Sequence, residues 1–378
     1  MRILLVTPHH SGSHRSWAEG YRGHSSHEVR LLDLPGRFWK WRMHGGAITL
    51  ARRYMKSGLQ PDLLLATDML DLTTFLALTR TTTARIPTVL YMHENQLTYP
   101  LPEKDDHRGA NDGETERDHH YAFVNFTSML VADAIWFNSS FHRTSFFNAL
   151  PTYLKQFPEH RELGRIAELE RKSLVLPVGV EMPESEPAKA GNLRGTPLVL
   201  WNQRWEYDKN PELFLEVLLE AAGENLEFEV ALCGESFQRK PAAFAAATSK
   251  LGDRIIHEGH ADRRAYEKLL RQAEVVISTA YHEFFGISIL EAISRDTFPI
   301  LPDRLSYPEL IPAQFHPQCL YNSPRELRHR LKWALTERRS AQATATELAR
   351  AVRRYAWEEV APGYDRAIEE LVNALQQA

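Results

Sequence analysis

Apolar and polar positions in the first half of the chain form short apolar runs that alternate with amphipathic segments. The first run, "RILLVTP" (2–8), stops at the polar loop "HHSGSH" and is followed by "RSWAEGYRG", which is typical of a helix. A strand, a tight loop and a helix form the first unit of a parallel α/β domain. Four further strand and helix pairs are expected at 27–35 and 45–55, 61–68 and 71–79, 86–95 and 122–133, and 134–140 and 141–150.

The second half repeats this rhythm after one more expected strand at 173–182. Its expected strands are 197–204, 227–234, 254–260, 273–280 and 297–303, and its expected helices are 212–223, 263–273 and 287–295. From residue 324 onward the chain is rich in Arg, Glu and Ala and predicts helices.

These patterns predict two Rossmann-like α/β domains in series, facing each other across a cleft, with C-terminal helices. The cleft would lie at the carboxyl ends of two parallel sheets, where such sheets bind ligands. The expected limits are 1–182 for the first domain, 183–196 for a Pro- and Gly-containing linker, 197–355 for the second domain, and 356–378 for a helix that packs back on the first. The charged, non-periodic stretch 101–120 predicts a surface loop.

Composition narrows the class of protein. The 378 residues are 43% hydrophobic and 25% charged, as in ordinary globular proteins, and contain only two cysteines, too few for a disulfide framework. No apolar run approaches the roughly 20 residues that cross a bilayer, and the N-terminal stretch is too short for a signal peptide, so a cytoplasmic location is expected. Basic and acidic residues balance at 21 each over 1–185, so a nucleic-acid partner would be held by a local patch.

The second domain carries the clearest candidate chemistry. "WNQRWEYDKN" places Arg204 and Lys209 just before a helix whose start is marked by Asn210 and Pro211, and two cations at a strand end can clamp a pyrophosphate. "HEFFGISILEA" offers Glu283 and, eight residues on, a second glutamate, with a glycine between them that opens a helix whose N–H groups can cradle a phosphate. Salt bridges and solvated helix faces are the alternative interpretation of each half of this set.

The stretch "RFWKWRMHGG" (37–46) leaves the carboxyl end of the second expected strand. Its cations suit a phosphate backbone and its tryptophans suit unstacked bases, although a buried helix start has a similar composition. Because residues two apart do not share a helix face, one tryptophan is expected to pack inward and the other to be available.

Both halves resemble known families. The two second-domain motifs resemble the donor site of the family-4 retaining GT-B glycosyltransferases. "YMHENQLTYP" (91–100), the segment 118–147, "GSH" (12–14) and "FWKWR" resemble the tRNA-queuosine mannosyltransferases, which attach mannose to queuosine in a tRNA anticodon.

The resemblance implies a role for each matching residue. Arg204 and Lys209 would hold and stabilise the leaving diphosphate, Glu283 would bind the donor sugar, Glu291 the ribose, and His93 would sit beside the sugar. The implied catalytic residues are His93, Arg204, Lys209 and Glu283. The implied donor-binding residues are Gly12, Ser13, Arg204, Lys209, Glu283, Phe285, Gly286, Ile287 and Glu291. The implied tRNA-binding residues are Arg37, Trp39, Lys40, Trp41, Arg42, Glu94 and Asn95.

The expected reaction is transfer of mannose from GDP-mannose to queuosine with retention of configuration, by front-face attack. No cofactor and no metal are expected. No two aspartates are separated by a single residue, so the metal-binding triplet of the other large glycosyltransferase class is missing. The histidines at 9, 10, 14, 107, 119 and 120 lack zinc spacing and are expected in polar loops. Two alternatives remain. One is a family-4 transferase acting on a glycolipid or polysaccharide precursor, for which "AITLARRYMK" (47–56) is a candidate membrane-surface helix. The other is a nucleotide-sugar-binding protein without turnover.

Overall fold

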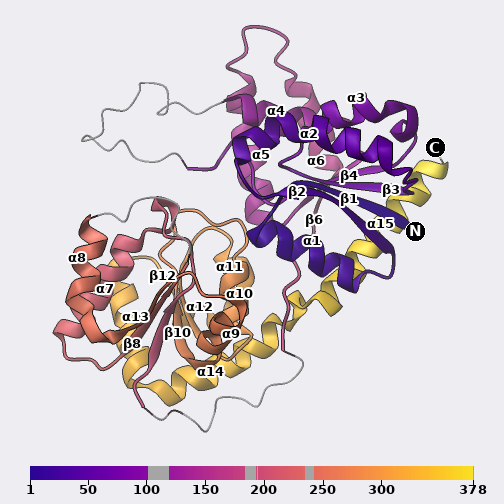
Figure 1. The fold of residues 1–378 in the computed structure, drawn as a ribbon. Coiled ribbons are helices and arrows are strands. Elements are labelled where there is room, and N and C mark those ends of the chain that lie inside the picture. The colour runs from indigo at the N-terminus through magenta and orange to yellow at the C-terminus, as the bar shows by residue number, and fades with distance from the viewer. Residues whose placement is uncertain (101–118, 184–192, 194, 235–241, 378) are drawn as a thin grey trace. The chain divides into compact units, whose positions relative to one another are not determined.

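A computed structural model describes residues 1–100, 119–183, 193, 195–234 and 242–377, and divides the chain into two compact units (Figure 1). Unit 1 consists of Met1–Val180 and Tyr355–Ala378, and unit 2 of Glu181–Arg354. The sequence-based linker 183–196 lies mostly outside the described residues, as does the loop expected at 101–120, apart from its last two residues, which begin a helix.

Unit 1 is built on one six-stranded parallel sheet in the order β2-β1-β3-β4-β5-β6. Its strands are β1 (Arg2–His10), β2 (Glu28–Pro35), β3 (Leu63–Thr67), β4 (Thr88–Met92), β5 (Ala134–Phe137) and β6 (Ser173–Val175). Every residue of β3, β4 and β5 is buried, because helices cover both faces of the sheet, and this explains their continuous apolar runs.

The helices of unit 1 are α1 (Gly12–His24), α2 (Trp39–Ser57), α3 (Leu72–Thr83), α4 (His119–Val131), α5 (Ser140–Leu154), α6 (Ile166–Arg171) and α15 (Trp357–Gln377). Figure 1 shows α1 and α15 on one face of the sheet and α2, α3 and α4 on the other.

Helix α15 is fixed in unit 1 by buried polar contacts. Trp17 Nε1 donates to Tyr364 Oη (3.1 Å), and the carboxylate of Asp365 accepts hydrogen bonds from Tyr21 and Ser25 of the α1 region at 2.8 and 2.7 Å. Burial raises the pKa of Asp365, but its hydrogen bonds outweigh this effect and hold the pKa below its usual value. The C-terminal helix is therefore an integral layer of the first unit.

Unit 2 repeats the architecture with a second parallel sheet in the order β12-β11-β10-β7-β8-β9. Its strands are β7 (Leu198–Trp201), β8 (Glu229–Cys233), β9 (Ile255–Gly259), β10 (Ala273–Ile277), β11 (Phe298–Pro302) and β12 (Leu320–Tyr321). Its helices are α7 (Pro211–Gly223), α8 (Ala242–Leu251), α9 (Arg263–Gln272), α10 (Ile287–Ile293), α11 (Tyr307–Leu310), α12 (His316–Cys319), α13 (Pro324–Thr336) and α14 (Arg338–Ala351).

The doubly wound α/β character expected for both halves is confirmed, with local differences. The strand expected at 173–182 ends at Val175, two residues before Pro177, which has no N–H to donate to a ladder. Helix α2 begins at Trp39 rather than near residue 45, so the basic and aromatic stretch forms its first turn. Gly12 and Ser13 open helix α1 instead of lying in a loop. None of the described helices combines the length and apolar character needed to cross a membrane.

Candidate active site

The loop after β7 positions Lys209 through its backbone and its buried surroundings. A 3-10 turn at Tyr207–Lys209 leads into α7, whose N-cap Asn210 has a left-handed φ of 51° and accepts a hydrogen bond from Leu213 N (3.4 Å). Lys209 is only 6% exposed, and its Nζ donates to the carbonyl of His282 at 2.6 Å. The same Nζ lies 3.3 Å from Glu283 Oε2, so the structure brings Lys209 and Glu283 together.

Asp208 is a buried carboxylate between the two candidate cations. Its Oδ2 lies 3.2 Å from Lys209 Nζ and 3.9 Å from Arg204 Nη2, and its carbonyl accepts hydrogen bonds from the N–H groups of Tyr281 and His282. Arg204 also lies 3.3 Å from Glu206. Both cations therefore form salt bridges with neighbouring acids, as the alternative interpretation expected. The Asp208 carbonyl also connects the loop after β7 to the loop that carries Glu283.

The loop after β10 joins Glu283 to a short helix. Glu283 Oε1 accepts from Phe285 N (3.3 Å), and Gly286 has a φ of +109°, a value that favours glycine. Helix α10 starts at Ile287, directly after this glycine, as the sequence predicted. Burial, then the charge of Lys209, lowers the pKa of His282 to about 4, so this imidazole is neutral at physiological pH.

Glu291 lies on α10 in a different set of contacts. Its Oε2 accepts from Tyr266 Oη at 3.0 Å, and its Oε1 lies 3.3 Å from Arg263 Nη1. Both partners come from α9. No contact among the described residues links Glu291 directly to Lys209 or Glu283, so the two glutamates belong to two neighbouring networks.

In unit 1, His93 follows the last residue of β4 and is held by Asp68. The His93 backbone N–H and its ring Nδ1 both contact Asp68 Oδ1, at 3.0 and 3.2 Å. Burial lowers the pKa of His93 to about 3, so its ring is neutral and donates Nδ1–H to the carboxylate. His93 Nε2 is buried and has no hydrogen-bond partner among the described residues. This arrangement leaves a lone pair on Nε2.

The His93 ring sits in an aromatic surround with Trp17 and Tyr91 at centroid distances of 4.6 and 4.7 Å. His14 lies at 4.3 Å and is buried, so the expectation that it is a polar loop histidine is wrong. His14, Asp68 and His93 each offer one ligand atom, and these atoms all lie within 4.8 Å of one another. Imidazole nitrogens together with a carboxylate oxygen can also hold a metal ion.

The residues after His93, for which tRNA contacts are implied, make hydrogen bonds within their own loop. Asn95 is completely buried, and its Oδ1 accepts hydrogen bonds from Leu97 N (3.1 Å) and Thr98 N (2.8 Å). Its Oδ1 therefore shapes the loop. The tRNA-binding role implied for Asn95 stays a prediction. Glu94 is partly buried and accepts from Gln96 Nε2 at 3.0 Å.

The first turn of α2 and the two residues before it form the α2 patch, which consists of Arg37, Phe38, Trp39, Lys40, Trp41 and Arg42. Trp39 is 38% exposed and packs on Tyr121 of α4 with ring centroids 5.3 Å apart, whereas Trp41 is 64% exposed. Trp41 is thus the more available of the two, but Trp39 is exposed as well, so the expectation that one tryptophan packs inward is wrong. Phe38, for which no tRNA contact was predicted, is 79% exposed and adopts a left-handed φ of 53°.

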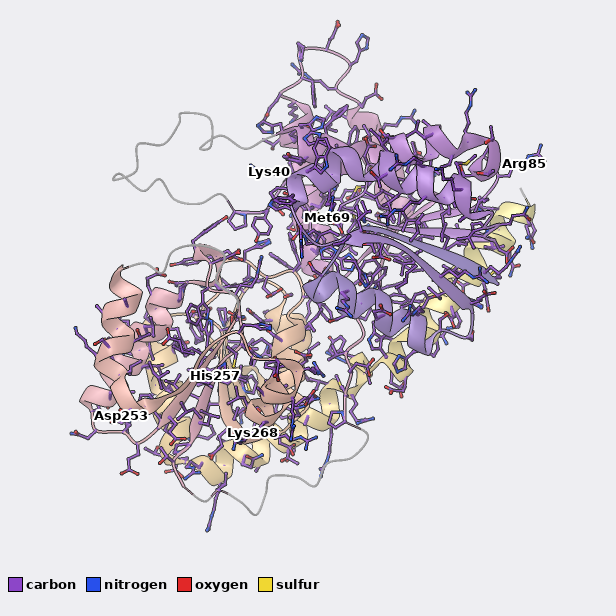
Figure 2. All side chains as sticks on the ribbon, in the orientation of Figure 1. Lys40, Met69, Arg85, Asp253, His257 and Lys268 are labelled. Atoms are coloured by element: carbon purple, nitrogen blue, oxygen red, sulfur yellow. The ribbon has the colours of Figure 1, made fainter. Side chains whose placement is uncertain are left out.

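A small buried cluster supports this patch from beneath. Met43, Met69, Tyr121 and Val124 pack together below the first turns of α2 and α4. Figure 2 marks Met69 of this cluster and Lys40 of the patch. The His44 and His120 rings stack at 4.7 Å and extend the aromatic surface onto α4. Strained backbone that keeps a bulky apolar ring in solvent is a feature of ligand-contact sites.

Several residues with roles in these networks escaped sequence reasoning. Asp208 lies between Arg204 and Lys209 in the sequence, a signal that could have identified it. Asp68 contacts His93 and Tyr266 contacts Glu291, in each case 25 positions along the chain. No local sequence pattern reveals contacts at that separation.

Comparisons with known proteins place this chain in a class. Residues 184–356 match the family model for glycosyl transferases group 1. The fold is similar to that of Anabaena HepE, crystallised with UDP and glucose (TM-score 0.65, 14% identity, 99% of this chain and 100% of that one). It is also similar to sucrose-phosphate synthase from Thermosynechococcus elongatus (TM-score 0.66, 14% identity, 99% and 100%). The chain is a glycosyltransferase with the two-domain GT-B fold.

The first unit identifies the family within that class. Residues 2–180 match the model for the N-terminal region of tRNA-queuosine alpha-mannosyltransferase. The tRNA-queuosine alpha-mannosyltransferase of Drosophila melanogaster is 32% identical over 339 residues, covering 87% of this chain and 85% of that protein. The chain belongs to the tRNA-queuosine alpha-mannosyltransferase family.

Proposed function

We propose that this glycosyltransferase moves mannose from GDP-mannose to the queuosine base of a tRNA anticodon, with retention of configuration, in the cytoplasm. The observation that carries the donor half is the buried Lys209 ammonium, which lies 3.3 Å from Glu283 in a loop that also carries Arg204. Family membership supports the acceptor half.

In this proposal the cations act on the leaving group. Arg204 and Lys209 bind the diphosphate and stabilise the charge that develops as the glycosidic bond breaks, which is electrostatic catalysis. The backbone of Phe285, Gly286 and Ile287 borders the phosphate, and Gly12 and Ser13 at the start of α1 contribute N–H groups. Glu283 accepts hydrogen bonds from the sugar and Glu291 from the ribose. The departing phosphate takes the proton of the acceptor, so no side chain is needed as a covalent nucleophile.

His93 supplies a hydrogen-bond acceptor for the sugar. Because Asp68 holds Nδ1–H, Nε2 carries the lone pair and can accept a sugar hydroxyl, with no positive charge on the ring. Asp68 is thus a positioning residue that fixes the tautomer.

This role gives a pH dependence. Burial raises the pKa of Asp68 to about 6, with the nearby His14 opposing the rise. As the pH falls through about 6, Asp68 gains a proton and no longer holds Nδ1–H as a carboxylate, so kcat/KM is expected to fall. His93 itself stays neutral in this range because its pKa is about 3. A profile of kcat/KM from pH 5 to 8 measures the effect, and Asp68→Asn should be slower and lack this ionisation. An identical profile in both proteins would remove Asp68 from the mechanism.

We also propose that transfer needs no metal ion and no cofactor. Arg204 and Lys209 supply the cations for the diphosphate, and two hydrogen bonds from His93 occupy Oδ1 of Asp68. Activity is expected to change less than twofold, about the precision of a rate assay, after dialysis against EDTA. A large loss that Zn²⁺ or Mn²⁺ restores would reject this proposal.

The test of the whole function is direct. The protein is incubated with GDP-mannose and either queuosine-containing or queuosine-free tRNA, and the nucleosides are analysed by mass spectrometry. One added hexose on queuosine, and none on queuosine-free tRNA, is expected. UDP-glucose and GDP-glucose serve as alternative donors, and no addition from any donor would reject the tRNA acceptor.

A glycolipid or polysaccharide acceptor is the second candidate, because Trp41, Ile48 and Met55 lie seven residues apart on α2 and are exposed. The other apolar positions of 47–56, such as Leu50 and Tyr54, are buried in unit 1, so this helix is not an unattached amphipathic helix. Sedimentation with vesicles containing anionic lipid distinguishes the two candidates, and no cosedimentation is expected from the tRNA proposal.

A further inference from the structure

Glu291 receives its orientation from a chain of hydrogen bonds that begins at the end of β7. Asn202, the residue after that strand, donates from Nδ2 to Tyr266 Oη at 3.1 Å and to the carbonyl of Ser288 at 2.7 Å. Tyr266 Oη in turn lies 3.0 Å from Glu291 Oε2. The chain therefore connects β7, α9 and the first turn of α10.

The direction of these bonds is fixed by chemistry. The amide nitrogen of Asn202 can only donate, so the Tyr266 oxygen accepts from it and uses its single proton toward Glu291. Burial, followed by the negative charge of Glu291, raises the pKa of the Tyr266 phenol well above 10, so the proton stays on the phenol. Consecutive bonds of this kind strengthen one another in a low-dielectric surround.

The two oxygens of Glu291 are held unequally. Oε2 is held by Tyr266, which is packed within unit 2. Oε1 faces Arg263, whose side chain is 59% exposed and also pairs with Glu267 of the same helix. The Glu291 side chain is only 16% exposed, so its charge needs a partner, but Arg263 is exposed and keeps Glu267 as a second partner. A ligand hydroxyl can therefore replace Arg263 at Oε1 without leaving either charge unpaired.

We propose that Tyr266, supported by Asn202, is a positioning residue that presents Oε1 of Glu291 to a ribose hydroxyl of the nucleotide donor. This inference rests on the proposed function, in which Glu291 binds the ribose, and deepens it by assigning residues that act through Glu291. It predicts a specific loss: Tyr266→Phe removes the bond to Oε2 and weakens only the part of the binding that comes from the ribose hydroxyls.

Calorimetric binding of GDP and of 2′,3′-dideoxy-GDP to the full-length protein tests this assignment. Tyr266→Phe is expected to weaken GDP binding about tenfold, the scale of one hydrogen bond to a charged group, and to change the binding of the dideoxy analogue less than about twofold. In turnover, the KM for the donor should rise while kcat changes little. Glu291→Gln should show the same dependence on the ribose hydroxyls.

Tyr321→Phe is the matched control, because it removes another buried hydroxyl of unit 2, which donates to Ser278 O at 2.9 Å, outside the Glu291 network. It should leave the binding of both nucleotides unchanged. Equal losses for GDP and the dideoxy analogue in Tyr266→Phe, or no loss for GDP, would overturn the proposal. These binding measurements need no tRNA. If Tyr266→Phe weakens only GDP binding but the wild type transfers no hexose to tRNA, the tRNA acceptor is rejected and the role of Tyr266 stands. If neither GDP nor UDP binds the wild type, both proposals fail.

Discussion

Replacing Lys209 with methionine is expected to lower kcat/KM for the donor by about a hundredfold or more, because in the proposed mechanism the leaving diphosphate loses a buried cation that stabilises its developing charge. Methionine keeps the length and apolar stem of the side chain. The measurement is the rate of hexose transfer, or of donor hydrolysis, at donor concentrations well below KM. Lys268→Met is the matched control, since Lys268 is an exposed lysine on α9 of the same unit (Figure 2).

Such a loss of activity could also come from unfolding of unit 2. A double variant separates loss of catalysis from loss of stability. Lys209→Met leaves the buried carboxylate of Asp208 without its nearest cation, which should destabilise unit 2 by about 1–3 kcal/mol. The double variant Lys209→Met/Asp208→Asn removes the unpaired charge and should recover much of that stability but none of the activity. If the double variant regained turnover, or if Lys209→Met stayed within a few-fold of wild type, Lys209 would be structural.

Local patterns were sufficient for the fold and for the helix starts beside the proposed donor site. The apolar runs of β3, β4 and β5 are continuous because both faces of that sheet are covered, and Asn210 and Pro211 do start a helix. Strand β12 has only two residues, too few to leave a periodic signal. Gly286 could be placed before a helix because only a residue tolerant of positive φ fits there.

Contacts between distant segments could not be read from the sequence. A motif match marks Asn95 as part of a functional stretch, but it cannot distinguish a residue that faces a ligand from one that is buried and caps a turn. Likewise, the neutral state of His93 depends on burial and on Asp68, which comes from the end of a different strand. Sequence patterns identify residue types at strand ends, whereas protonation states follow from the packing around them.

Charge reversal in the α2 patch is expected to weaken tRNA binding while sparing the donor site. Lys40→Glu/Arg42→Glu should lower the affinity for tRNA about 10- to 100-fold at low salt and reduce the slope of log K against log salt by about 1.4, since each lost phosphate contact on a single strand accounts for roughly 0.7. Hydrolysis of GDP-mannose without tRNA should be unchanged, because both residues belong to unit 1, whereas Arg204 and Lys209, the proposed donor-site cations, belong to unit 2.

The matched control for this prediction lies on the same helix. Arg52→Glu/Lys56→Glu makes the same change in net charge on exposed positions three and four turns further along α2, so it reproduces any effect of overall charge. If both double variants weakened tRNA binding equally, the long-range field and not the patch would hold the tRNA. Binding by Trp41→Ala and Phe38→Ala then separates stacking from charge, because loss of a base-stacking ring costs affinity without altering the salt slope. An unchanged affinity in all of these variants would leave the exposed rings of α2 without a role in the acceptor site.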